Sequence, residues 1–213
     1  MRRILLLTGM DPAHRIYDRL LPLLPNAMIV DWIQPAPYES ITSYAARLSR
    51  TVCCDEPAVV CGVSFGGIVA RELASCLNAS TCVLIASVRS PRELPPWFRI
   101  CRVLAPPLAV AIMRITGTVA TCCPRRFKSS STWRLTKLAG KSGAWHRWAT
   151  VAVLSWKSSE DAQRIPSVQI HGDRDVVFPV RYTSADTIFR GGGHDLPLTH
   201  CQEIAGKLLQ IAA

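Results

Sequence analysis

The sequence predicts an α/β protein built on a six-stranded, mostly parallel, doubly wound sheet. The main observation is that short apolar segments alternate with amphipathic helical segments along most of the chain. This alternation is typical of parallel sheets whose two faces are both covered by helices. The second observation is length, because a chain of 213 residues buries about 70% of its unfolded surface and needs no cross-links to form a core.

The first half of the chain begins with a predicted strand over 3–8, which contains the apolar run Ile4 to Leu7. A short helix over 15–21 is expected next, since Pro22 lacks the N–H that a further turn would need. A second strand follows over 28–33. Ser40 then starts a helix in which apolar residues recur every three or four positions, at Ile41, Tyr44, Ala45, Leu48 and Val52.

Three further elements follow in close succession: a strand over 58–63, a helix over 65–77 and a strand over 81–87. Two short strands are predicted much later, at 167–170 and 186–189, each closed by a polar or glycine-rich turn. The chain ends in a helix for which Thr199 and Gln202 form a capping box. The predicted apolar face of that helix consists of Ile204, Ala205, Leu208 and Ile211.

The most informative motif is the G-x-S-x-G pentad from Gly62 to Gly66, which lies between a predicted strand and a predicted helix. A serine hydroxyl is a poor nucleophile at neutral pH, so it must project from a sharp turn towards a base. Ser64 occupies that position, and the Phe65 amide at the start of the helix points where negative charge would develop. A plain structural turn or a phosphate-binding loop has a similar composition.

The two partners that a serine nucleophile needs occur later in the chain. A carboxylate is available in the turn His171-Gly172-Asp173-Arg174-Asp175, and a histidine ends the turn Arg190-Gly191-Gly192-Gly193-His194. Each turn directly follows a predicted strand. The chain order Ser, Asp, His is that of one catalytic-triad architecture and differs from the orders of the two other well-known serine proteases.

These motifs, spread from Leu6 to His194, resemble the α/β-hydrolase family. The resemblance implies that Ser64 is the nucleophile, His194 the base and Asp175 the orienting acid. Asp173 remains a competitor for the acid role. Asp195 adjoins His194 but is not assigned to the triad, because sequence neighbours usually point apart.

The resemblance also implies an oxyanion hole and a reduced form of the fold. The family places a second oxyanion amide after a glycine that follows an early strand, which nominates Met10 beside Phe65. This sequence has Thr8 before Gly9, where the family usually has histidine. Two of the usual eight strands are missing, and only a single helical turn is expected between Asp175 and His194.

The segment 89–160 differs sharply in composition from the rest of the chain, at the place where the family commonly inserts a helical cap. It holds thirteen Lys or Arg against two acidic residues, a net charge of +11, whereas the whole chain carries +10. It also holds five of the six tryptophans. The predicted organisation is therefore a hydrolase core over 1–88 and 161–213, with a basic, Trp-rich helical cap over 89–160.

Three interpretations of this basic segment stay open. It is a solvated arginine face over tryptophans that line an acyl pocket, a docking surface for an acidic acyl carrier or anionic substrate, or a peripheral contact with anionic lipid. A transmembrane span is not expected, because the apolar run from Val103 to Met113 has only 11 residues. Nucleic-acid binding is not expected either, since no recognised binding motif accompanies the charge.

Cysteine usage and the amino terminus favour a cytoplasmic protein with reduced thiols. The chain has nine cysteines, but no C-x-x-C spacing, and only four strongly apolar residues follow Arg2-Arg3, too few for a signal peptide. Cys61, Cys76 and Cys82 are expected to be small core residues.

The predicted function is a serine hydrolase that cleaves a carboxylic ester or thioester through an acyl-enzyme on Ser64, with no metal or cofactor. Two alternatives remain: a lyase on the same scaffold with His194 as base, and a non-catalytic module that binds a small molecule or an acidic partner. His171 is expected to be a structural hydrogen-bonding residue. No partner is identified for His14, His146 or His200.

Overall fold

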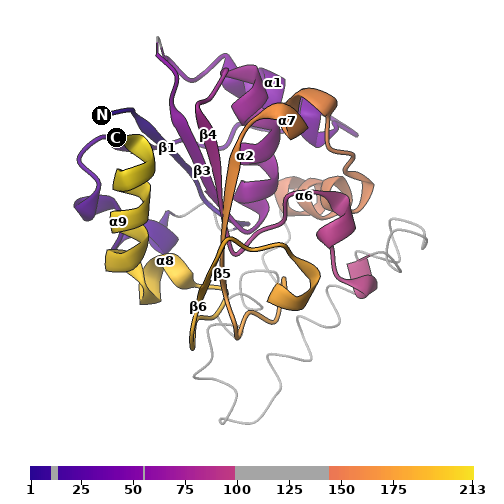
Figure 1. The fold of residues 1–213 in the computed structure, drawn as a ribbon. Coiled ribbons are helices and arrows are strands. Elements are labelled where there is room, and N and C mark those ends of the chain that lie inside the picture. The colour runs from indigo at the N-terminus through magenta and orange to yellow at the C-terminus, as the bar shows by residue number, and fades with distance from the viewer. Residues whose placement is uncertain (11–13, 55, 99–143) are drawn as a thin grey trace.

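The computed structural model describes residues 1–10, 14–54, 56–98 and 144–213. Six strands form one sheet in the order β2-β1-β3-β4-β5-β6, and every neighbouring pair is parallel. The strands are β1 (Ile4–Leu7), β2 (Ala27–Ile29), β3 (Val59–Val63), β4 (Thr81–Ile85), β5 (Ser167–Gly172) and β6 (Thr187–Phe189). The predicted six-stranded parallel sheet is confirmed (Figure 1).

Helices and 3-10 turns connect these strands. In the described residues they are η1 (Arg15–Tyr17), η2 (Leu21–Leu23), α1 (Ile41–Ser49), α2 (Phe65–Cys76), η3 (Pro91–Glu93), α6 (Ala144–Ser155), α7 (Glu160–Arg164), η5 (Val180–Tyr182), α8 (Leu196–Thr199) and α9 (Cys201–Ala212). The single helix predicted over 15–21 is wrong, because two short 3-10 turns lie there. Pro22 stands near the start of η2, where its missing N–H costs nothing, so it begins a new turn.

The two faces of the sheet are packed by different sets of helices (Figure 1). Leu5 and Leu7 of β1 belong to a buried cluster with α1, α2 and α6, whereas Ile4 and Leu6 belong to a second cluster with η1, α8 and α9. All four side chains are fully buried. Strands covered on both faces consist of continuous apolar runs rather than alternating ones, which is why these strands are recognisable in the sequence.

The start of the last helix differs from the prediction. Thr199 is the final residue of α8, and α9 begins at Cys201 with no side-chain cap from His200. The Thr199 hydroxyl bonds instead to the Asp195 carbonyl and the His200 ring. The predicted capping box of Thr199 and Gln202 is therefore wrong, because Thr199 still has a place in the preceding turn. The predicted apolar face is confirmed at Ile204, Ala205 and Leu208, while Ile211 is half-buried.

The cysteine predictions are partly confirmed. Cys61 on β3 and Cys82 on β4 are fully buried, and burial raises the pKa of both thiols, that of Cys82 to about 12. Both are therefore poor nucleophiles at neutral pH. Cys76 is exposed, so its predicted place in the core is wrong. It is the last residue of α2, at the end of that helix.

Ion pairs and hydrogen bonds connect the two ends of the predicted insert to the hydrolase core. Near its first end, the Arg89 guanidinium pairs with Asp186 and donates to the Ser184 carbonyl at 2.6 Å. Near its second end, Glu72 of α2 is buried and accepts bonds from Trp156 Nε1 at 3.0 Å and Ser159 Oγ at 2.7 Å. Arg89 is thus an internal cross-link rather than part of a solvated arginine face.

Most of the basic segment lies outside the described residues. Nine of its thirteen basic side chains are at positions between 99 and 143, as is Trp133. The cap, its boundaries at 89 and 160 and the three interpretations of its charge therefore stay predictions. A membrane-spanning helix needs about 20 apolar residues, and none is found in the part of the chain that the structure describes.

Candidate active site

Ser64 lies at the turn between β3 and α2 in a backbone conformation that non-glycine residues rarely adopt. Its φ is 56° and its ψ is −124°, and such a geometry persists only where surrounding contacts impose it. Those contacts are present: the Ser64 N–H donates to the Ile85 carbonyl at 3.0 Å. The Ser64 carbonyl accepts from Ser87 Oγ at 2.6 Å. The predicted elbow is therefore a turn held by two hydrogen bonds, and the Ser64 side chain projects beyond the end of β3.

The flanking glycines of the pentad are required by close backbone approach. A Cβ atom on Gly62 would overlap the Gly66 carbonyl, and a Cβ on Gly66 would overlap the Thr8 carbonyl. Any larger residue would push α2 away from β3, or the loop after β1 away from the elbow. The spacing of the motif thus follows from how tightly three backbone segments meet beside Ser64.

The loops after β5 and β6 bring the carboxylate and the histidine together. The Arg174 N–H donates to the Gly192 carbonyl at 2.9 Å. The Asp173 carboxylate accepts from the Gly191 N–H at 2.7 Å. Asp173 is therefore engaged in fixing the glycine turn that presents His194. Among the described residues, the carboxylate bonded to the His194 imidazole is that of Asp175, not Asp173.

Asp175 is the carboxylate that reaches the histidine. One oxygen, Oδ1, accepts from the N–H groups of Val177 at 2.8 Å and Phe178 at 3.0 Å. The other, Oδ2, lies 2.8 Å from His194 Nδ1, and both side chains are almost entirely buried. On the opposite side of the ring, His194 Nε2 lies 2.7 Å from Ser64 Oγ. The structure thus brings Ser64, His194 and Asp175 into one hydrogen-bonded chain.

The two proposed oxyanion donors, Phe65 and Met10, belong to segments that adjoin Ser64. Phe65 is the first residue of α2, and within the described residues no acceptor is hydrogen-bonded to its N–H. Gly9, just before Met10, packs on the nucleophile, since a Cβ there would lie 3.5 Å from Ser64 Cβ. The positive end of the α2 dipole adds to the preference for negative charge at this point.

Thr8 occupies the position where the family usually has histidine, and a side-chain hydrogen bond holds it in place. The side chain is fully buried, and its Oγ1 accepts from Trp32 Nε1 at 2.8 Å. This bond joins the loop after β1 to the segment after β2. The departure from the family pattern therefore leaves the loop that carries Met10 anchored by a different pair of side chains.

His146 is a site residue that the sequence did not reveal. It comes from α6, within the predicted insert, and its Nε2 donates to the Met10 carbonyl at 2.9 Å. The two residues are 136 positions apart, and no local motif marks either of them as a partner. The predicted insert therefore contacts the loop after β1 directly.

An aromatic cluster joins α6 to the nucleophile elbow. The Phe65 ring packs edge-on against both Trp145 and Trp148, with ring centroids 5.7 and 5.9 Å apart. The ring centroids of Tyr44 in α1 and Trp148 are 4.4 Å apart, and those of Trp32 and Trp145 are 5.3 Å apart. Such contacts hold α6 against the residue that follows Ser64.

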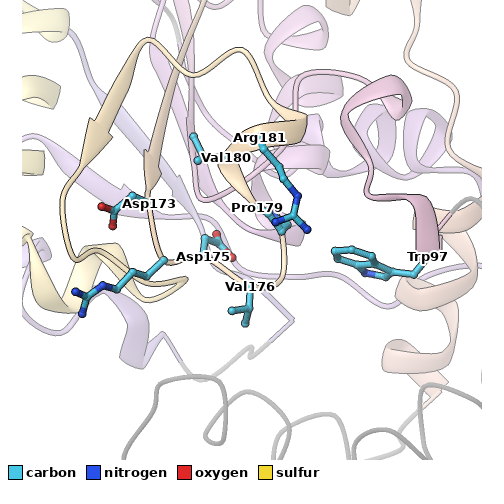
Figure 2. Close-up of a pocket in the computed structure, with 8 residues that line it drawn as sticks. Trp97, Asp173, Asp175, Val176, Pro179, Val180 and Arg181 are labelled. Atoms are coloured by element: carbon cyan, nitrogen blue, oxygen red, sulfur yellow. The ribbon is translucent and has the colours of Figure 1, made fainter.

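A cavity of about 460 Å³ lies next to Asp175 (Figure 2). Its walls come from the loop 173–181 and from Trp97 near the first end of the insert. Ser64 and His194 do not line it. Asp175 is the residue that the cavity shares with the hydrogen-bonded chain, and the Asp175 side chain itself is fully buried. Within the described residues, no group of three or more His, Cys, Asp or Glu side chains is arranged to hold a metal ion.

His171 acts as a structural hydrogen-bonding residue, as expected from the sequence. It is fully buried, and its Nε2 donates to the Ser87 carbonyl at 2.7 Å, which links β5 to the residue that holds the Ser64 carbonyl. Burial lowers the pKa of this imidazole below its ordinary value of 6.5, because the charged form loses hydration in the core.

The lowered pKa of His171 predicts a pH-dependent stability. Above about pH 6.5 the imidazole is neutral in both states. As the pH falls below that value, the unfolded chain takes up a proton that the folded chain resists, so the free energy of unfolding decreases until the pH passes the folded-state pKa. In urea titrations, His171→Gln keeps an N–H donor and should show a shallower loss between pH 7 and 5 than the wild type. Parallel curves would contradict this expectation.

Comparison with known proteins identifies relatives in fold only. No protein-family model and no curated protein matches the chain. Among solved structures, ClbQ from the colibactin NRPS/PKS pathway has a TM-score of 0.65 at 14% identity, covering 98% of this chain and 95% of that one. A thermophilic esterase from Thermogutta terrifontis has a TM-score of 0.67 at 16% identity, with 100% and 91% covered. A lipase-esterase related protein from Clostridium acetobutylicum has a TM-score of 0.69 at 13% identity, with 99% and 94% covered.

Proposed function

We propose that this chain, which has the α/β-hydrolase fold, is a serine hydrolase that cleaves a carboxylic ester or thioester. The observation that carries the proposal is the continuous chain of two hydrogen bonds, 2.7 Å from Ser64 Oγ to His194 Nε2 and 2.8 Å from His194 Nδ1 to Asp175 Oδ2. A nucleophile, a base and an orienting acid within hydrogen-bond reach are what acyl transfer requires. The esterase names among the structures of similar fold agree with this chemistry.

In the proposed mechanism, His194 Nε2 takes the proton of Ser64 Oγ as that oxygen attacks the substrate carbonyl. The developing oxyanion is held by the N–H groups of Phe65 and Met10. His194 then gives the proton to the leaving alcohol or thiol, which leaves an acyl group on Ser64. A water molecule activated by the same imidazole hydrolyses this ester. Asp175 fixes the imidazole tautomer throughout and stabilises its charged form.

The proposal is tested by labelling with a fluorophosphonate, followed by a panel of p-nitrophenyl esters and acyl thioesters. We expect one equivalent of probe on Ser64, located by peptide mass spectrometry, and a burst of the first product before steady turnover. A lyase that uses His194 as base would cleave a cyanohydrin-type substrate with no covalent acyl adduct. A binding module would show neither labelling nor turnover.

His146→Ala is expected to lower kcat about tenfold with little change in KM, because loss of its bond to the Met10 carbonyl loosens a donor that acts mainly in the transition state. Loss of an oxyanion donor itself typically costs about 10²- to 10³-fold, so a positioning effect should be smaller. His146→Gln retains an N–H at a similar reach and should restore most of the rate. Equal damage from both variants, or a change in KM alone, would contradict this role.

A further inference from the structure

The cavity beside Asp175 contains a positive charge that has no acidic partner in the described residues. Arg181 lines the cavity, and its side chain forms none of the ion pairs found in that part of the chain. Its guanidinium lies instead over the Tyr182 ring, 4.8 Å from the centroid. A cation over an aromatic face is held in place, but its charge is not neutralised.

Trp97 completes this end of the cavity. Its indole packs edge-on against Tyr182, with centroids 6.0 Å apart, so Arg181, Tyr182 and Trp97 form one connected group. In Figure 2 the Arg181 guanidinium and the Trp97 indole approach one another, with Pro179 and Val176 nearby. A guanidinium and a flat aromatic surface are thus presented together, a combination that suits an anionic group attached to an apolar or planar body.

The two acidic residues of the cavity lining form no ion pair with Arg181 in the described residues. Asp175 uses Oδ1 for two backbone N–H groups and Oδ2 for His194. Asp173 uses Oδ1 for the Gly191 N–H. The lining is formally neutral, since Arg174 also belongs to it, but both carboxylates already accept hydrogen bonds from other groups. Neither carboxylate forms an ion pair with Arg181 in the described residues, so its guanidinium can donate charge-assisted hydrogen bonds to an added anion.

We propose that this cavity binds an anionic group of the substrate, a carboxylate or phosphate on the same molecule as the ester or thioester that Ser64 attacks. Arg181 acts as the counter-ion, and Trp97 packs against the part of the substrate that links the two groups. A volume of about 460 Å³ lies within the range of small-molecule pockets. The proposal rests on the proposed hydrolase function and adds a substrate class to it.

The test compares matched substrates in the wild type and in three variants. The neutral substrate is p-nitrophenyl valerate, and the anionic ones are p-nitrophenyl hemiglutarate and a phosphate-bearing p-nitrophenyl ester of similar length. The wild type should prefer at least one anionic ester. Arg181→Gln should reduce the ratio of anionic to neutral kcat/KM about tenfold, the order of one charge-assisted hydrogen bond, while Arg181→Lys should retain part of it. Arg50→Gln removes the same charge from an exposed position outside the cavity and should leave the ratio unchanged.

Comparing hemiglutarate with the phosphate ester then tells which anion the cavity takes. Equal ratios in the wild type and Arg181→Gln would overturn the proposal while leaving the hydrolase function intact. An independent arm measures binding of glutarate to Ser64→Ala by quenching of tryptophan fluorescence, which needs no turnover. Saturable quenching that Arg181→Gln weakens about tenfold supports the site even if no ester is cleaved. Quenching of the same strength in Arg181→Gln overturns it.

Discussion

Ser64→Ala is expected to abolish fluorophosphonate labelling and to lower kcat for any cleaved ester by about 10⁴- to 10⁶-fold, as typically follows loss of a triad nucleophile. The physical reason is that Ser64 Oγ is the only group in the hydrogen-bonded chain that can form the acyl bond. Alanine keeps the Cβ and therefore the same backbone strain, so the fold should be preserved. Steady-state kinetics and a thermal melt on the same preparation check both statements.

The matched control for this variant is Ser43→Ala. Ser43 is exposed on α1, and its loss should change neither labelling nor rate. Near-normal esterase activity in Ser64→Ala would remove the acyl-enzyme from the proposal. Loss of labelling together with a collapsed melting transition would instead point to damage at the elbow, and circular dichroism separates that case from loss of chemistry.

Asp175→Asn is expected to lower kcat by roughly 10⁴-fold, as happens when the orienting carboxylate of a triad becomes an amide. The Asn Oδ1 can still accept from the Val177 and Phe178 N–H groups that Asp175 Oδ1 serves. The amide NH₂ then faces His194 Nδ1, which must become an acceptor, so that Nε2 carries the proton and cannot take another from Ser64. The rate of phosphonylation by the probe should fall in parallel.

Asp173→Asn is the matched isosteric control. The new amide oxygen can still accept from the Gly191 N–H that Asp173 now binds at 2.7 Å, so the glycine turn should hold and the rate should fall far less. A pair of kcat measurements at pH 8 is sufficient. Greater damage from Asp173→Asn than from Asp175→Asn would transfer the acid role to the other carboxylate.

The predicted strands agree best with the structure in β1, β3 and β4, where the apolar runs are buried on both faces. The edge strand β2 is partly exposed and spans only Ala27–Ile29, so the predicted strand over 28–33 is too long at its end. Agreement was weaker where local signals compete. Pro22 suggested the end of a helix and instead begins η2, and Thr199 suggested a cap but completes α8. Pro22 lacks an N–H and Thr199 has a hydroxyl that can accept or donate, as the prediction requires. The neighbouring turns decide whether each residue ends one element or belongs to another.

Some parts of the candidate site could likewise be predicted from the sequence, and others could not. The elbow is predictable because its sequence signature is local, two glycines and one serine within five residues. The groups that hold Ser64 in its conformation, Ile85 and Ser87, are distant in sequence. The resemblance to the α/β-hydrolase family favours Asp175 over Asp173, and the structure places the Asp175 Oδ2 against His194. His146 and Glu72 were not predicted, because their partners lie 136 and more than 80 positions away and carry no motif of their own.

What the sequence alone determined is the set of elements and the order of the reactive groups along the chain. Apolar runs, helical periodicity and steric limits at glycine act over a few residues, so they are visible without the fold. Tertiary structure decided which groups meet: Asp173 with the glycine turn, Thr8 with Trp32, His146 with Met10, and Arg181 with Tyr182 rather than an acid. These pairings depend on how distant segments pack, and packing sums many weak contacts from the whole chain that no short pattern records.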